Sequence, residues 1–471
     1  MDSRSTSISP AAIASSPARP VASRTQLLLT GPIFPTLLRL SAPNVLNLLA
    51  IVAMITFDAI FIGTLGADAL AGVSLVFPWV MFMQHAAASG MGGGVSSAIA
   101  RALGAGERDL ADALAAHAVV LAVVLAAITS TLMLSCGPLL YRLMGGQGAT
   151  LAAALTYSNA VFSGVISIWA LNILANVVRG TGNMGLPAFV IVGSVLAHVL
   201  LSPALIFGWG PFPELGPAGA GWGLIISFGA GSIVLVAHLR SSSALVTLAF
   251  RGLKLRRRLF ADILRVGVPG MLNVGITNLS VVILTGIAGR LGQETAIGYA
   301  MGARLEYILI PLAFGFGTAI VAMVGTNWGA KQFQRARRIA WVGAITVALA
   351  CGSIGVFFAL FPQVWMGLFT DKEEIVRAGS LYLRIAGPIY AFYGLGMALY
   401  FSTQGLGHVL PAVAANGARL LVSAGAGLAG VFWLGAGPVG FFTAIAGGFF
   451  LYGVLTVWVL LVVKEPAPAR K

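Results

Sequence analysis

The sequence predicts an all-α polytopic membrane protein with twelve transmembrane helices in two pseudo-symmetric six-helix lobes. Three observations predict this fold. Apolar runs of about 20 residues recur along the whole chain, charged residues make up only 9% of it, and its two halves share a repeated pattern. A soluble chain carries about 25% charged residues. An outer-membrane barrel would show short alternating segments, which this sequence lacks.

The twelve spans follow from the apolar runs, and their orientation follows from the loops. Lys and Arg gather in alternate loops, most densely around Arg256, Arg257 and Arg258. The positive-inside rule therefore predicts that both termini are cytoplasmic, in a bacterial inner membrane. The net charge of +14 is assigned to these loops rather than to a nucleic-acid partner. The predicted spans are 36–63, 70–98, 112–136, 150–178, 185–208, 218–239, 262–289, 294–325, 338–361, 376–402, 409–432 and 437–463.

An internal repeat relates the two halves. LLRLSAPNVLN (37–47) matches ILRVGVPGMLN (263–273) at an offset of 226, the separation of Pro43 and Pro269. Six spans per half make the repeat parallel, and such halves usually flank a central cavity. The predicted organisation is a flexible cytoplasmic tail (1–33), an N-lobe (34–240), a basic cytoplasmic linker (241–261), a C-lobe (262–463) and a cytoplasmic tail (464–471).

Asp58 breaks this repeat, because its counterpart is Leu284. A carboxylate at membrane depth costs roughly 2.5–3.5 kcal/mol on insertion scales, so it needs a wet cavity or a function. We interpret Asp58 as a protonatable coupling site that faces the N-lobe interior. The structural alternative is a carboxylate that snorkels to the interface. Pro43 lies about 22 Å earlier along a helix, where it is either a hinge or a static kink.

The repeated segments resemble the multidrug and toxic compound extrusion (MATE) family, over about residues 35–460. The likeness is closer to the branch with a single first-helix acid (DinF-like). It implies a secondary active antiporter whose coupling carboxylate is Asp58 and whose first helix bends at Pro43 when that acid changes protonation. The segments that carry it are the LxxP entry to the first span, FDAIFIGTLG (57–66), GAGERDLADA (104–113), RGTGN (179–183) and VGTNWGAKQFQRARR (324–338).

Four more polar residues are candidates for the coupling site. In related proton- or sodium-coupled members the fifth span resembles LNxxLDP, and here His198 and Ser202 stand at the Asn and Asp positions. This difference weakens a sodium site, since hard cations want several oxygens. It leaves a proton relay between His198 and Asp58 as a hypothesis, beside a histidine that is only hydrogen-bonded within the bundle. Asn172 and Asn176 share one helix face, where they either join the site or hold helices together.

Substrate binding is predicted from methionine, aromatic and amide side chains, which suit lipophilic cations through adaptable packing and cation–π attraction. Ordinary packing is the alternative for any one of them. Other family members carry acids in spans seven and ten, where this chain has Thr277 and Leu395. The candidates are Met54, Phe57, Met81, Met83, Asn47, Asn273, Met301 and Tyr307.

The predicted function is export of amphipathic, often cationic organic compounds in exchange for protons, with sodium as the alternative ion. The sequence has no Walker motif and no serine–histidine or zinc signature, so no cofactor, metal or catalytic residue is expected. A flippase for lipid-linked oligosaccharides is the first alternative, and a membrane-embedded enzyme or receptor is the least favoured. A monomer in the lipid bilayer, without nucleic acid, is expected.

Overall fold

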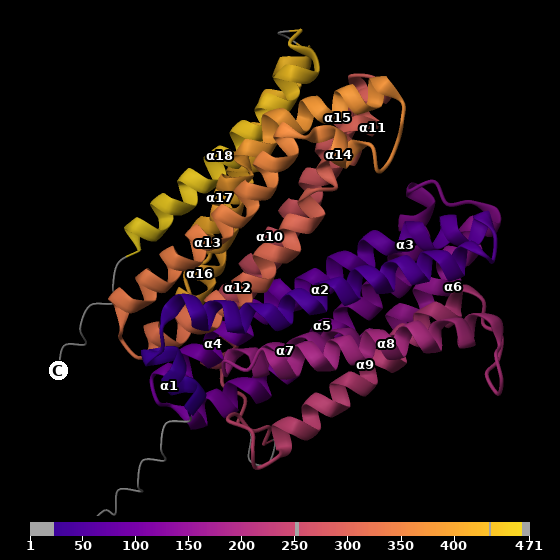
Figure 1. Cartoon of the computed structure of the whole chain (residues 1–471). Coiled ribbons are helices and arrows are strands. Elements are labelled where there is room, and N and C mark those ends of the chain that lie inside the picture. The colour runs from indigo at the N-terminus through magenta and orange to yellow at the C-terminus, as the bar shows by residue number, and fades with distance from the viewer. Residues whose placement is uncertain (1–22, 250–253, 433–434, 464–471) are drawn as a thin grey trace, which may run out of the picture.

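The computed structural model describes residues 23–249, 254–432 and 435–463, and every regular element in these ranges is helical. Two groups of helices, α2–α9 and α10–α18, form the two lobes (Figure 1). The lobes converge at the end of the molecule that carries α1 and diverge toward the opposite end (Figure 1). At the converging end, Arg101 of the N-lobe pairs with Asp262 of the C-lobe at 2.8 Å.

The first lobe contains eight α-helices and one π-helical segment, η1, and the short helix α1 precedes it. The bounds are Ser23–Thr30 (α1), Ile33–Gly63 (α2), Ala67–His85 (α3), Ala86–Met91 (η1), Gly92–Gly104 (α4), Arg108–Leu143 (α5), Gly148–Ser163 (α6), Ile166–Gly180 (α7), Gly185–Phe207 (α8) and Pro217–Arg240 (α9).

The second lobe contains nine α-helices and the short 3-10 segment η2. The bounds are Arg257–Arg290 (α10), Gln293–Ala303 (α11), Glu306–Gly329 (α12), Phe333–Leu360 (α13), Pro362–Met366 (α14), Glu373–Ala386 (α15), Gly387–Ile389 (η2), Tyr390–Leu406 (α16), Leu410–Phe432 (α17) and Gly437–Val462 (α18).

The predicted set of twelve spans is confirmed by the lengths and composition of these helices. Within the described ranges, eleven continuous or nearly continuous helices are long and apolar enough to cross a membrane. The twelfth span is the pair α6 and α7, which is bent by 47°. The span over 67–104 contains η1, and a π-helical turn of this kind is frequent at functional sites.

Helix α1 departs from the prediction of a flexible tail through residue 33. Its Leu28 side chain is only 2% exposed and lies against Gly182 of the N-lobe. From the C-lobe, the Asn327 amide donates to the Leu28 carbonyl at 3.0 Å, and Arg335 donates to the Gly31 carbonyl. The prediction is wrong for residues 23–33, because their leucines have an apolar surface to bury. Residues 1–22 and the predicted tail 464–471 lie outside the described residues.

The linker is attached to the N-lobe in the parts that the structure describes. The Thr247 amide donates to an Asp112 carboxylate oxygen at 2.7 Å, and the Arg256 amide donates to His117 Nε2 at 2.9 Å. Helix α10 begins at Arg257, earlier than the predicted boundary at 262. The described ends of the linker, 241–249 and 254–256, are therefore both hydrogen-bonded to α5.

Helix α2 crosses from one lobe to the other. In its first half, Leu37 is fully buried in the hydrophobic core of the C-lobe, against residues of α12 and α13. In its second half, Met54 and Ile62 belong to the hydrophobic core of the N-lobe. Pro43, the predicted hinge, lies between these halves, and the helix is continuous through it. Because proline has no N–H, the helix lacks one backbone bond near this crossing.

Helix α10 crosses between the lobes in the opposite sense, from the N-lobe to the C-lobe. Leu259 and Ile263 at its start belong to the N-lobe core, whereas Leu284 and Ile287 near its end belong to the C-lobe core. Pro269 lies between them. The two repeat-related helices therefore exchange lobes, and the repeated proline marks the crossing in both. This position explains why proline recurs in the half without an acid.

Candidate functional site

The candidate site is formed where the second half of α2 packs against α8. Asp58 points from α2, and its side chain is 22% exposed. His198 faces it from α8, and its side chain is 0% exposed. The apolar pattern of α8 buries the face that carries His198 and Ser202, which are four residues apart on one helix face.

His198 and Asp58 are in direct contact. Nε2 of His198 lies 2.9 Å from both Oδ1 and Oδ2 of Asp58. The Ser202 hydroxyl donates to Oδ1 at 3.2 Å. The contact that the relay hypothesis requires is therefore present, and both oxygens of the carboxylate accept a bond from α8.

The second nitrogen of His198 limits the protonation states that the pair can hold. Nδ1 is buried and has no hydrogen-bond partner among the described residues. An ionised carboxylate only accepts, so Nε2 must donate to it, and a neutral ring then leaves an unprotonated Nδ1. A buried lone pair without a donor is tolerated more readily than a buried N–H without an acceptor. The geometry therefore fits ionised Asp58 beside neutral His198.

One further proton disturbs this arrangement. On the ring it creates an N–H at Nδ1, where no described residue offers an acceptor. On Asp58 it creates an O–H, which meets the N–H already on Nε2 unless the carboxyl turns. Leaving a buried donor unsatisfied costs about 1–3 kcal/mol. The observed hydrogen bonds therefore leave no satisfied position for one more proton among the described residues.

Helix α9 closes the space behind the ring. A Cβ built at Gly223 would lie 3.3 Å from His198 Nδ1 and 3.1 Å from the Ser202 Cα. Glycine here lets the α9 backbone pack directly on the two site residues. No signal in the sequence singled out Gly223 among the 60 glycines of the chain.

Asn172 and Asn176 stay outside the hydrogen bonds of Asp58. The Asn172 amide donates to the Ile168 carbonyl of its own helix at 2.9 Å. The Asn176 amide donates to the Asn172 carbonyl at 2.9 Å and to the Ala88 carbonyl in η1 at 3.0 Å. Of these bonds, the one from Asn176 to Ala88 joins two helical segments of the N-lobe.

The polar groups that bond Asp58 are one ring nitrogen and one hydroxyl. His198 occupies both Asp58 oxygens, and Ser202 is the other polar neighbour that bonds the carboxylate. In the described part of the chain, no group of three or more His, Cys, Asp or Glu residues could hold a metal ion. Sodium prefers several oxygen ligands, whereas this site presents a ring nitrogen.

The residues predicted to bind substrate differ in exposure. Met54 and Met83 are buried in the N-lobe core, and Asn47 is only 4% exposed. Asn273 accepts a bond from the Asn416 amide at 2.8 Å, inside the C-lobe. The others are partly or well exposed and lie on different helices: Phe57, Met81, Met301 and Tyr307.

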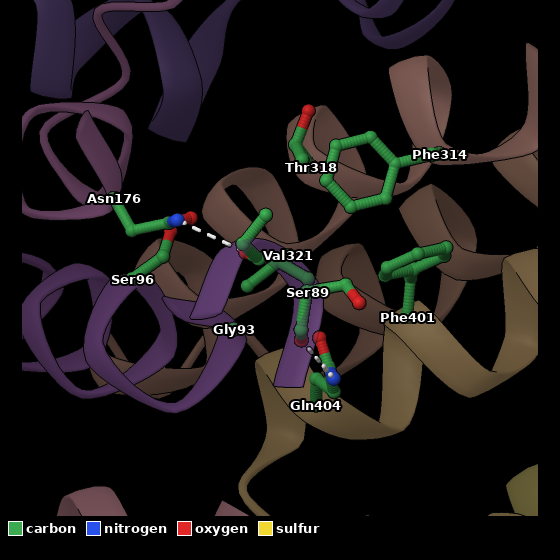
Figure 2. A pocket seen from close by; sticks show the side chains of 10 residues that line it. Ser89, Gly93, Ser96, Asn176, Phe314, Thr318, Val321, Phe401 and Gln404 are labelled. Carbon is green, nitrogen blue, oxygen red and sulfur yellow. Dashed lines mark hydrogen bonds between the residues drawn. The ribbon is translucent and has the colours of Figure 1, made fainter. Parts of the chain in front are cut away.

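A small pocket lined by both polar and apolar side chains lies between the lobes beside η1 (Figure 2). Gln404 of the C-lobe donates to the Ser89 carbonyl at 3.1 Å, as Asn176 does to Ala88 from the other side. Phe314 and Phe401 flank it (Figure 2). The pocket has room for about one water molecule, at ≈ 10 Å³. It is too small for an organic substrate, so the lobes are closed here.

Comparison with known proteins places this geometry in a family. The MatE family model matches residues 43–204 and 269–427, once in each lobe. The chain belongs to the MatE family. The two matches begin at Pro43 and Pro269, so they confirm the repeat at the predicted offset. The resemblance to MATE transporters is thereby confirmed, and the chain is an integral membrane transporter.

Two relatives in the MatE family cover most of the chain. It is 26% identical over 382 residues to an FAD transporter of Shewanella oneidensis, with 80% of this chain and 82% of the relative covered. It is 28% identical over 388 residues to the probable multidrug resistance protein NorM of Thermotoga maritima, with 80% of each chain covered.

Solved MatE structures share the whole fold. A MATE crystal structure in complex with MaD3S superposes with a TM-score of 0.84 at 25% identity, covering 94% of this chain and 98% of that chain. The outward-facing conformation of a multidrug resistance MATE transporter superposes with a TM-score of 0.82 at 25% identity, covering 93% and 97%.

Proposed function

We propose that this chain is a proton-coupled antiporter that exports amphipathic, often cationic organic compounds. The observation that carries the proposal is the contact between Asp58 and His198 inside the membrane-spanning bundle. This pair takes up a proton only with a change in its hydrogen bonds. Such a pair can link proton binding to a change of shape, which is what ion-coupled transport requires.

The orientation of the chain in the membrane is inferred from the distribution of positive charge. The basic loops lie at the end where the lobes converge, which is the cytoplasmic end if the positive-inside rule holds (Figure 1). The end at which the lobes are closed around η1 is then the cytoplasmic end. In our scheme a proton entering from outside neutralises the pair, α2 rearranges near Pro43, and the exported compound leaves. Release of the proton to the cytoplasm restores the loading state.

The substrate class is drawn from the relatives. Several are named for multidrug resistance or multidrug export, including NorM of Thermotoga maritima and MepA of Staphylococcus aureus. One relative, at 26% identity, is named an FAD transporter, so a flavin belongs in any substrate panel. We expect a monomer in a bacterial inner membrane, with both termini cytoplasmic.

Transport into everted membrane vesicles tests this proposal. A fluorescent cationic dye and FAD would be offered under an imposed proton gradient or an imposed sodium gradient, with wild type beside Asp58→Asn. We expect the proton gradient alone to drive dye uptake, and Asp58→Asn to abolish gradient-driven uptake while the protein remains folded. Full activity of Asp58→Asn would contradict the coupling role of Asp58. Uptake driven by sodium alone would contradict the choice of ion.

A further inference from the structure

The crossing of α2 has a polar contact at its centre, directly after the hinge residue. Asn44 follows Pro43 and is 1% exposed, between the lobes. Its Nδ2 donates to the Thr318 hydroxyl on α12 at 2.8 Å and lies 3.4 Å from the Gly315 carbonyl. Thr318 in turn donates to the Gly315 carbonyl at 3.2 Å. The direction of the bond from Asn44 to Thr318 is thereby fixed.

The position of Thr318 ties this bond to the closed interface. Thr318 is 7% exposed and lines the pocket beside η1, across which the lobes meet (Figure 2). The first half of α2 is held by the C-lobe and the second half by the N-lobe. Any separation of the lobes at this end must therefore either bend α2 or break the bond between Asn44 and Thr318.

The repeat offers an internal comparison. The counterpart of Asn44 is Gly270, which packs backbone to backbone on η1: a Cβ there would lie 2.9 Å from the Gly90 Cα. Gly270 has no side chain that could make and release a hydrogen bond. The N-terminal half, which carries Asp58, thus has an asparagine directly after its repeated proline. The C-terminal half, which carries Leu284 instead of the acid, has a glycine there.

We propose that the hydrogen bond between Asn44 and Thr318 is the latch through which the Asp58–His198 pair controls closure of the lobes. Asn44 acts as a positioning residue, because its hydrogen bonds go to α2 and α12 and not to Asp58 or His198. It holds α2 on α12 while the pair is in the observed arrangement, and the bond is released when α2 rearranges. This inference rests on the proposed proton coupling. It names the Asn44–Thr318 bond as the contact through which the rearrangement of α2 reaches the C-lobe.

The latch can be tested by measuring the separation of the lobes directly. Spin labels at Glu107→Cys and Gln334→Cys, both exposed and on opposite lobes, report that separation in a background carrying Cys136→Ser and Cys351→Ala. Distances would be recorded in lipid nanodiscs over a series of pH values. An interhelical hydrogen bond in a membrane shifts such an equilibrium by roughly threefold to tenfold.

We expect Asn44→Ala and Thr318→Val each to raise the separated fraction by that factor and to weaken its dependence on pH. Thr318→Ser keeps the hydroxyl and should behave like wild type. Because both partners serve one bond, the double variant should be no worse than either single variant. The matched control is Asn278→Ala, since the Asn278 amide bonds the Val274 carbonyl of its own helix, at 2.9 Å.

Two outcomes would overturn the latch. One is a separated fraction in Asn44→Ala equal to that in wild type, and the other is a double variant whose effect is the sum of both single effects. Asp58→Asn separates this failure from failure of the proposed function. If Asp58→Asn abolishes the pH response and Asn44→Ala leaves it intact, only the latch is wrong. If Asp58→Asn keeps the response, the coupling role of Asp58 is wrong.

Discussion

His198 donates through one nitrogen to both oxygens of Asp58, at 2.9 Å each, while its other nitrogen faces no acceptor in the described part of the protein. The pair therefore has one arrangement without an added proton and must change to accept one. A lone carboxylate in water would carry no such constraint. In the proposed coupling, this difference between the two ring nitrogens is the reason why uptake of a proton changes the hydrogen bonds between α2 and α8.

Replacing His198 tests this asymmetry. His198→Ala leaves Asp58 with the Ser202 hydroxyl as its hydrogen-bond partner from α8. Hydrogen bonds to charged groups contribute about 1.5–3 kcal/mol, so we expect proton-driven transport to fall by roughly tenfold or more. The measurement is dye uptake against pH in everted vesicles. His238, which is partly exposed near the end of α9, provides a control in His238→Ala. An unchanged pH profile in His198→Ala would count against the relay.

The family pattern in the fifth span suggests a gain-of-function test. The double variant His198→Asn/Ser202→Asp restores the Asn and Asp of the LNxxLDP segment and replaces a ring nitrogen by oxygens beside Asp58. Since sodium favours several oxygen ligands, we expect transport by this variant to become stimulated by sodium, whereas wild type is indifferent to it. Uptake under a sodium gradient at constant pH is the measurement. Equal indifference in both proteins would show that ion choice depends on residues outside this pair.

The sequence predicts most where its composition and its internal repeat indicate the same structure. Twelve apolar runs and the offset between Pro43 and Pro269 were sufficient for the spans and for two parallel lobes. The contact between Asp58 and His198 can be hypothesised from the sequence, because both are polar residues within otherwise apolar helices. The resemblance to a family then supplied the role of Asp58.

Other features depend on how helices meet, which periodicity does not encode. The exchange of α2 and α10 between lobes is visible only in the two hydrophobic cores. Asn44 lies beside the matched Pro43, but its counterpart in the repeat is Gly270, so the repeat does not single it out. The partner of Asn44, Thr318, lies 274 residues away along the chain. Helix α1 was missed because Leu27–Leu29 is too short a run to predict burial alone.

Gly223 offers a finer test of the site, since it controls the space at Nδ1 of His198. The added methyl group of Gly223→Ala would sit 3.3 Å from that nitrogen, so α9 or the ring must shift by a few tenths of an ångström. Overpacking of this kind costs about 1–3 kcal/mol. We expect a shifted pH dependence of transport with a folded protein. Gly193→Ala on α8 is the control, because a Cβ there meets nothing within 4 Å.

Helix α1 gives the last prediction, which concerns the stability of the closed end. Leu28 is 2% exposed between Gly182 of the N-lobe and the α12 surface that binds its carbonyl. Truncating a buried leucine to alanine costs about 2–5 kcal/mol. Leu28→Ala should therefore lower the thermal unfolding midpoint in detergent and raise the separated fraction reported by the spin-label pair at Glu107→Cys and Gln334→Cys. Gln26→Ala, on the exposed face of α1, should change neither. If Leu28→Ala matched Gln26→Ala in both measurements, α1 would not be one of the contacts that stabilise the closed end.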